Sequence, residues 1–335
     1  MHYDIIGDVH GCASQLEQRL IGLGYRRSGG AGAYHHRTHR AVFVGDLIDR
    51  GPQQRETLEL VKAMVDGGSA QVVMGNHEFN AVAYATEHPN YPGAYLRSHS
   101  EKHSRQHQAF LDQLTVSQQQ YYVRWFKTLP LWLDLGELRV VHACWHEGSM
   151  RVVEKYCGGA DHNRLTTIEQ LVLAADKHSK SDLYDAVEVL LKGPEINLEH
   201  YSGLPHYRDK DGNLRNTPRI CWWREGAMEL SKVTELHRYK TADGRDYPPL
   251  NSDELRSEDR SYVYNSNVPV FYGHYWREGS PKHINDYTRH TACVDFSAVE
   301  LDGGGGTLVA YRWSGESEID KENYVPHGSA HPVMD

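Results

Sequence analysis

The stretch Gly45–Gly51 (GDLIDRG) decides the fold, because it joins a short apolar run to a turn that is rich in charged side chains. The preceding run, Ala41–Gly45 (AVFVG), has the length and apolar character of a buried strand. Glu56–Val65 follows with apolar residues at positions 58, 60, 61, 64 and 65, which is the spacing of one helix face. The segment therefore predicts a strand, a polar turn and a helix.

Two neighbouring segments repeat this order. Tyr3–Gly7 (YDIIG) leads into GDVHG and then into the helical stripe Cys12–Leu23. Ala70–Gly75 (AQVVMG) leads into GNHE and then into a predicted helix at about Glu78–Thr86. Such alternation of strands and helices favours an α/β layered fold.

Four later segments are predicted as strands. Leu138–His142 and Val268–Gly273 are short apolar runs that end at a histidine and a glycine. Thr291–Phe296 and Thr307–Trp313 are predicted as a closing antiparallel pair, with its turn at Gly303–Gly306.

The length of 335 residues suits one large domain or two ordinary ones. Two helix-like stretches, Ile168–Lys177 and Ser181–Leu191, are followed by a polar region rich in Gly, Pro, Asp and Tyr. We therefore expect a single domain over residues 1–335, with a helical and irregular elaboration inserted at about 146–265. The polar segment Asn90–Gln108 is predicted to be a loop or lid.

The composition excludes several classes of protein. With 45 acidic and 36 basic residues the chain has a formal charge of −9, and it contains 22 histidines. General binding of nucleic acids or of anionic membranes is not expected, since both need a basic surface. No apolar run approaches the ~20 residues of a membrane helix, and no secretory signal is visible. Five scattered cysteines without a CxxC pair fit reduced thiols, so we expect a cytoplasmic protein.

Side chains of metal-binding types follow five of the predicted strands. Since α/β sheets build ligand sites at the carboxyl ends of strands, we expect these side chains to lie together. Mixed oxygen and imidazole ligands suit Mn, Fe or Zn rather than Ca, and gathered aspartates would repel unless cations neutralise them. Two metals that share a carboxylate clamp a phosphoryl group and generate a nucleophile. The residues in these positions are Asp8, His10, Asp46, Asp49, Arg50, Asn76, His77, Glu78, His142 and His274.

The three glycine-bounded motifs and the two late histidines resemble those of the calcineurin-like metallophosphoesterases. The unbroken GDLIDRG is similar to the corresponding motif of the phosphoprotein phosphatase branch. That branch also includes the bacterial diadenosine tetraphosphatases. The resemblance implies a four-layer α/β/β/α sandwich of two mixed sheets flanked by helices. It also implies two divalent metal ions, for which we expect Mn, with Fe, Zn, Ni or Mg as alternatives. For the first metal it implies the ligands Asp8, His10 and Asp46. For the second it implies Asp46 as the shared ligand, with Asn76, His142 and His274.

The resemblance assigns the catalytic roles as well. Arg50 and Asn76 would bind the substrate phosphate, and a planar guanidinium is well shaped for this. His77 would be no ligand but the general acid that protonates the leaving group, oriented by Asp49. The nucleophile would be a metal-bridging hydroxide, with no covalent enzyme intermediate. Relatives use a second arginine from the elaboration, for which Arg224 is our first candidate and Arg219 the second.

Some aromatic and histidine positions leave alternatives open. Trp222 and Trp223 could stack on a nucleobase, but packing of the elaboration onto the core is the favoured interpretation. His99, His103 and His107 would share one face if their segment were helical, and we interpret them as surface residues.

We therefore expect a two-metal-dependent phosphohydrolase, with phosphomonoesterase activity of the protein phosphatase type as the main hypothesis. Hydrolysis of dinucleoside polyphosphates is the alternative, so the partner would be a phosphoprotein or a nucleotide. The sequence does not indicate an oligomeric state. A catalytically inactive binding scaffold is opposed by the complete set of ligand types. A histidine-rich metal-storage protein would require binding by clustered histidines outside the motifs.

Overall fold

The structure is a computed structural model, and it describes residues 1–28, 32–159, 162–179, 181–201, 203–209, 212–250, 254–299 and 306–325. The strands in these ranges are β1 (His2–Ile6), β2 (Arg26–Arg27), β3 (Tyr34–His35), β4 (His39–Phe43), β5 (Ala70–Val72), β6 (Trp132–Asp134), β7 (Arg139–Val141), β8 (Tyr207–Arg208), β9 (Leu214–Arg215), β10 (Lys240–Thr241), β11 (Val270–Tyr272), β12 (Thr291–Cys293), β13 (Ala310–Trp313) and β14 (Tyr324–Val325). The α-helices are α1 (Ala13–Gly22), α2 (Gln54–Asp66), α3 (Asn76–Ala85), α4 (Glu101–Gln106), α5 (Gln108–Gln113), α6 (Val116–Phe126), α7 (Glu147–Cys157), α8 (Ile168–Ala175), α9 (Asp182–Lys192), α10 (Leu230–Val233) and α11 (Ser257–Arg260).

Two mixed sheets form the centre of the molecule. The first has the strand order β14-β13-β1-β4-β5, in which β1, β4 and β5 are parallel and β13 and β14 are antiparallel to their neighbours. The second has the order β12-β11-β7-β6, with β6 antiparallel to β7. The parallel strands are short, and their last residues are buried: β11 and β12 are buried throughout, and β4 is buried from Ala41 to Phe43. Such burial is expected for sheets that are covered on both faces.

Alternate residues of the strands pack on opposite faces of the sheets. Ile5, Val42, Val140 and Phe271 belong to one apolar cluster that both sheets share, so the sheets pack face to face. The intervening positions, such as Phe43, join a second cluster that contains the buried faces of the helices. The α/β/β/α sandwich predicted from the sequence is therefore confirmed.

The predicted closing pair is wrong. Thr291–Cys293 pairs with the parallel strand β11 in the second sheet, whereas Ala310–Trp313 pairs with β1 in the first. β12 lies at the edge of the second sheet, whereas β13 lies between β1 and β14 in the first, and this long-range choice leaves no local sequence signal. The predicted turn at Gly303–Gly306 lies largely outside the described residues.

The segment 90–108, predicted as a loop or lid, is partly helical, since α4 lies within it and Ser100 caps the helix with its side chain.

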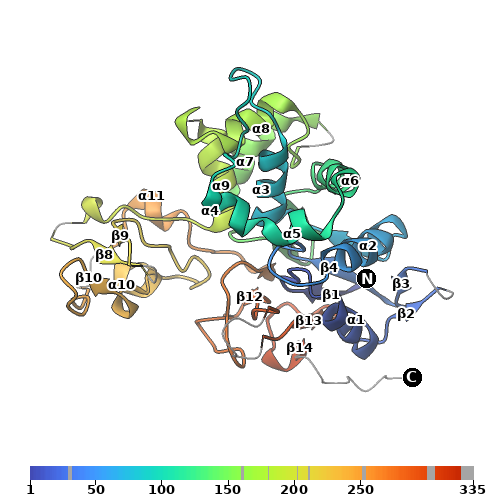
Figure 1. Cartoon of the computed structure of the whole chain (residues 1–335). Coiled ribbons are helices and arrows are strands. Elements are labelled where there is room, and N and C mark those ends of the chain that lie inside the picture. The colour runs from blue at the N-terminus through green and yellow to red at the C-terminus, as the bar shows by residue number, and fades with distance from the viewer. Residues whose placement is uncertain are drawn as a thin grey trace.

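The segment 146–265 lies between the neighbouring strands β7 and β11. Its helices α7, α8 and α9 gather with α3 on one side of the body, and β8, β9, β10, α10 and α11 form a lobe that projects from it (Figure 1). The lobe has a small apolar core of its own.

Trp222 and Trp223 fix the elaboration to the second sheet. Both are buried, and both contact Tyr272 of β11, Trp223 in a stacked arrangement. The packing interpretation of these tryptophans is therefore confirmed.

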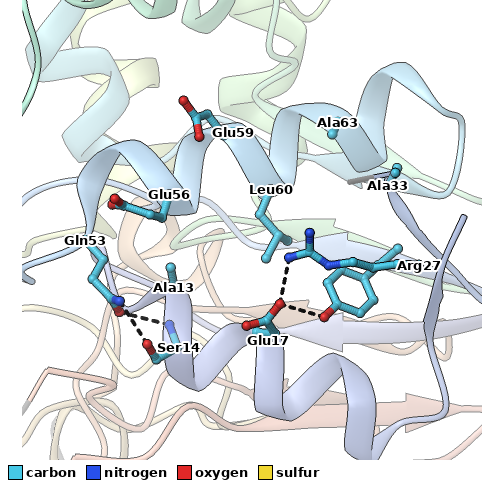
Figure 2. A pocket seen from close by; sticks show the side chains of 12 residues that line it. Ala13, Ser14, Glu17, Arg27, Ala33, Gln53, Glu56, Glu59, Leu60 and Ala63 are labelled. Carbon is cyan, nitrogen blue, oxygen red and sulfur yellow. Dashed lines mark hydrogen bonds and ion pairs between the residues drawn. The ribbon is translucent and has the colours of Figure 1, made fainter. Parts of the chain in front are cut away.

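The helices that follow the first two motifs, α1 and α2, lie side by side with a groove between them (Figure 2). At their N-terminal ends the Gln53 side chain accepts a hydrogen bond from the Ser14 amide (2.9 Å) and donates one to its hydroxyl (2.9 Å). At the other end Glu17 accepts hydrogen bonds from Arg27 (2.6 Å) and Tyr34 (2.7 Å). The Gln53–Ser14 contacts thus join the segments that follow the first two motif turns, whereas the Glu17 contacts join α1 to β2 and β3. None of the described helices has both the length and the apolar composition of a membrane-spanning segment.

Candidate active site

The predicted ligands come together at the carboxyl ends of five strands. Asp8 and His10 follow β1, Asp46 follows β4, and Asn76 opens α3 directly after β5. His142 and His274 follow β7 and β11, which are neighbours in the second sheet. Two groups of side chains have ligand atoms within 4.8 Å of one another, and Asp46 belongs to both: His10, Asp46 and His77 form the first, and Asp46, His142 and His274 the second.

Backbone carbonyls set the orientation of two of the histidines. His10 Nδ1 donates to the Ile48 carbonyl (2.8 Å), and His142 Nδ1 donates to the Val44 carbonyl (2.7 Å). Because the carbonyls can only accept, each ring then presents Nε2 to the cluster, 3.7 Å and 3.5 Å from the Asp46 carboxylate. Outer partners of this kind are typical of imidazole ligands to metals.

The centre of the cluster contains more acceptors than donors. Asn76 Oδ1 lies 3.0 Å from His142 Nε2 and 2.8 Å from His274 Nδ1. Asp8 Oδ1 is buried without a hydrogen-bond partner, although Asp8 Oδ2 accepts from the His274 amide (3.1 Å). Buried, unpaired acceptors are costly unless a cation binds to them. The residues present therefore fit divalent cations.

The charges of the cluster support this conclusion. Burial and the neighbouring carboxylates of Asp295 and Asp46 raise the pKa of Asp8 well above its usual range. Burial lowers the pKa of His10 to about 3, so this ring is neutral, as a metal ligand must be. Asp295 was not among the predicted residues, although it is buried and its charge acts on Asp8. A divalent cation would relieve the repulsion among these carboxylates.

The backbone is bent sharply at the motifs. Of the eight non-glycine residues with positive φ in the described part of the chain, five are predicted site residues: His10, Asp46, Asp49, Arg50 and His274. Such conformations cost free energy and cluster at functional sites. Gly45 and Gly75 allow two motif turns to touch, since a Cβ atom on Gly45 would lie 2.6 Å from the Gly75 Cα.

His77 points into the same cluster from α3. Its Nδ1 donates to Asp49 Oδ2 (2.6 Å), and its Nε2 lies 3.9 Å from Asp46. Burial alone would lower the pKa of His77, but the negative charges of Asp46 and Asp49 outweigh it and raise the pKa. An imidazole whose pKa is raised, and which is held beside the ligand cluster, is arranged as a general acid would be.

The sequence model of one family, described as calcineurin-like phosphoesterase, matches residues 1–275. The chain belongs to the calcineurin-like phosphoesterases. The motifs GDVHG, GDLIDRG and GNHE, together with His142 and His274, all lie within this match.

Several named proteins are similar to parts of this phosphoesterase. The chain is 46% identical over 78 residues to the bis(5'-nucleosyl)-tetraphosphatase PrpE of Oceanobacillus iheyensis. This match covers 23% of this chain and 30% of that protein. It is 32% identical over 152 residues to the PrpE of Bacillus subtilis (strain 168), and this match covers 43% of this chain and 57% of that protein. The chain therefore spans well under two thirds of the length of these relatives. A solved protein serine/threonine phosphatase from Saccharomyces cerevisiae is 12% identical, with a TM-score of 0.46 and 99% and 82% of the two chains covered.

Glu78 connects two motif turns of the phosphoesterase. It is fully buried, and its carboxylate accepts hydrogen bonds from the amides of Asp46 (2.9 Å), Leu47 (2.8 Å) and Gly75 (3.0 Å). The motif GNHE thus contributes a structural carboxylate in addition to Asn76.

We expect Glu78→Gln to lower the free energy of unfolding by about 2–3 kcal/mol, because its NH₂ group would leave at least one buried amide without an acceptor. Urea unfolding of the two proteins measures this loss. Glu56→Gln, an exposed carboxylate on α2, is the matched control. An unfolding midpoint equal to that of the wild type would contradict the structural role of Glu78.

His107 is a residue that the sequence interpretation missed. It is buried rather than exposed, and its Nδ1 donates to Asp49 Oδ1 (2.8 Å) while His77 occupies Oδ2. Burial alone would raise the pKa of Asp49, but these two hydrogen bonds outweigh it and lower the pKa to about 2. His107 therefore holds the carboxylate that orients His77. His99, in contrast, stacks between Tyr84 and Tyr95.

We expect His107→Leu to lower turnover of an alkyl phosphate about tenfold, a typical effect of removing an orienting partner. Turnover of p-nitrophenyl phosphate, whose leaving group needs no proton, should change little. His107→Asn should restore most of the loss, since its amide nitrogen can occupy the position of Nδ1. Equal losses with both substrates, or no restoration by asparagine, would show that His107 only packs.

The ligand cluster opens into a cavity of about 840 Å³ that reaches the lobe. Arg50 and Arg219 line it, and the Arg50 guanidinium lies 4.1 Å from the centre of the Trp276 ring. Arg224, our first candidate, does not line it. Its guanidinium donates instead to the Lys232 carbonyl (2.8 Å), with further contacts to Glu235 and Asn285. The structure thus favours the second candidate, Arg219.

Proposed function

We propose that this phosphoesterase hydrolyses phosphate monoesters with two divalent cations. The proposal assigns Asp8, His10 and Asp46 to the first cation and Asp46, Asn76, His142 and His274 to the second. The observation that carries it is the position of Asp46 in both groups of ligand atoms. Cations at this position would neutralise phosphoryl charge and lower the pKa of water to near neutrality. We propose Mn as the native metal.

The remaining roles belong to the chain's own groups. Arg50 and Arg219 would hold phosphoryl oxygens at the mouth of the cluster, since both guanidinium groups line the cavity. His77 would donate the proton from Nε2 to the leaving oxygen while Nδ1 stays bound to Asp49. Asn76 would contribute its amide to the phosphate as well as to the metal.

A second candidate is hydrolysis of dinucleoside polyphosphates. It is supported by the names of the bacterial relatives, which are bis(5'-nucleosyl)-tetraphosphatases. A phosphoprotein and a nucleotide are therefore the two substrate classes to compare. The cytoplasmic location and the single domain with an elaboration at 146–265 stay predictions.

The test is hydrolysis after loading with Mn. The chain should release phosphate from p-nitrophenyl phosphate and lose this activity with a chelator, and a phosphopeptide and a diadenosine polyphosphate should rank the two substrate classes. Failure to hydrolyse any of the three after metal loading would contradict the enzymatic function.

A further inference from the structure

A second cavity, of about 640 Å³, lies on the His77 side of the cluster. Asp49, Arg50, Asn76 and His77 line its inner end. Residues of α3, of the segment before α4, and of α4 itself form its outer walls. A substrate whose phosphate lies on the metal ligands would extend its leaving group into this cavity, because His77 faces the leaving oxygen.

The lining of this cavity is strongly cationic. Its basic side chains are Arg50, Arg97, Arg105, Lys192 and Arg219, and its single carboxylate is Asp49, which His77 and His107 already occupy. Arg105 and Lys192 are paired with Glu101 and Glu188. For Arg50, Arg97 and Arg219 we find no ion pair with any residue in the described ranges. Three guanidinium groups therefore line this cavity without a carboxylate of the described ranges in ion-pair contact.

Arg97 is the most firmly placed of the three. Its Nη1 donates to Asn80 Oδ1 (3.0 Å) and its Nη2 to Gln106 Oε1 (2.9 Å). Asn80 lies one helical turn after His77 on α3, so the guanidinium is tied to the helix that carries the proposed acid. Both partners are neutral amides, which orient the group but do not neutralise it. Burial lowers the pKa of Arg97 below its usual range, although the negative charges of Asp49 and Glu188 act in the opposite direction.

We propose that Arg97 forms an anion subsite for a phosphoryl group that belongs to the leaving group. The inference rests on the proposed function, since His77 defines the leaving-group side. In the reaction, water adds to the scissile phosphorus and releases a proton, and the bond from phosphorus to the bridging oxygen breaks. The bridging oxygen takes a proton from His77 and leaves with the second phosphoryl group. The leaving group keeps its own phosphoryl group on Arg97. Arg97 therefore selects substrates that carry a second phosphoryl group over simple monoesters.

The test compares two substrates of the Mn-loaded chain, inorganic tripolyphosphate and p-nitrophenyl phosphate. Arg97→Met should lower kcat/KM for tripolyphosphate about tenfold or more, since a charge-assisted hydrogen bond to phosphate is lost. The value for p-nitrophenyl phosphate should stay within about twofold, because that leaving group carries no second anion. Arg97→Lys should retain part of the preference. Chelation by tripolyphosphate is the same for every variant, so the differences report on the protein.

Arg105→Met is the matched control, because Arg105 lines the same cavity but is paired with Glu101 (2.6 Å). It should leave both substrates unchanged. Equal losses with both substrates in Arg97→Met would overturn the proposal, as would unchanged tripolyphosphate hydrolysis.

Calorimetric titration with tripolyphosphate separates this inference from the proposed function. If no substrate is hydrolysed but Arg97→Met still weakens tripolyphosphate binding about tenfold or more, the function fails and the subsite stands. If p-nitrophenyl phosphate is hydrolysed and tripolyphosphate binds equally to both proteins, the subsite fails and the function stands.

Discussion

Asp46→Asn is expected to lower kcat/KM for p-nitrophenyl phosphate by more than about a thousandfold. Asp46 is the one residue common to both groups of ligand atoms, so its loss should affect both cations. Metal ions contribute several kcal/mol of charge stabilisation, and each loss of about 1.4 kcal/mol lowers the rate tenfold. The bound metal of the purified variant should fall together with its activity.

The fold should survive this change, because the Asp46 amide still donates to Glu78 (2.9 Å). Circular dichroism of the variant therefore serves as the structural check. Asp286→Asn is the matched control, since Asp286 is a buried carboxylate that pairs with Arg277 outside the ligand groups (3.4 Å). Near-normal metal content and activity in Asp46→Asn would show that Asp46 does not bridge two ions.

His77→Ala should lower turnover of alkyl phosphates about 10²- to 10⁴-fold, which is the usual contribution of a general acid. Its effect on p-nitrophenyl phosphate should be much smaller, because that leaving group departs without a proton. The metal content should not change. Steady-state rates over a series of leaving groups, with metal analysis of the same preparation, measure both properties.

The geometry makes this variant informative, because His77 is grouped with His10 and Asp46 as well as with Asp49. Loss of one metal ion from His77→Ala would mean that His77 is a ligand and that the assignment of Asp8 must be revised. His107→Leu, which removes the other hydrogen bond to Asp49, should show the same dependence on the leaving group with a smaller amplitude.

Local patterns in the sequence were sufficient to predict the central strands and helices. They were also sufficient to predict that the ligand candidates lie together at the carboxyl ends of the strands. The runs before GDVHG, GDLIDRG and GNHE became β1, β4 and β5, because strand and helix periodicities are properties of neighbouring residues. The pairing of Thr291–Cys293 and Ala310–Trp313 was not predictable in this way, because each joins a different sheet.

Two contacts around the ligand cluster were also not predictable from local patterns, because they depend on tertiary structure. His107 lies 58 residues from Asp49, and the spacing of its neighbouring histidines suggested only an exposed helix face. Arg219 and Arg224 are five residues apart in a polar segment, and the backbone of the elaboration decides which of them lines the cavity.

The central claim is that the cluster around Asp46 holds two divalent cations, and the metal content of the chain tests it most directly. Mass spectrometric metal analysis of the wild type, after loading with Mn and removal of free metal, should give two ions per chain. The ratio should fall in Asp46→Asn and stay at two in His77→Ala. A wild-type chain that hydrolyses p-nitrophenyl phosphate with no bound divalent metal would contradict the account.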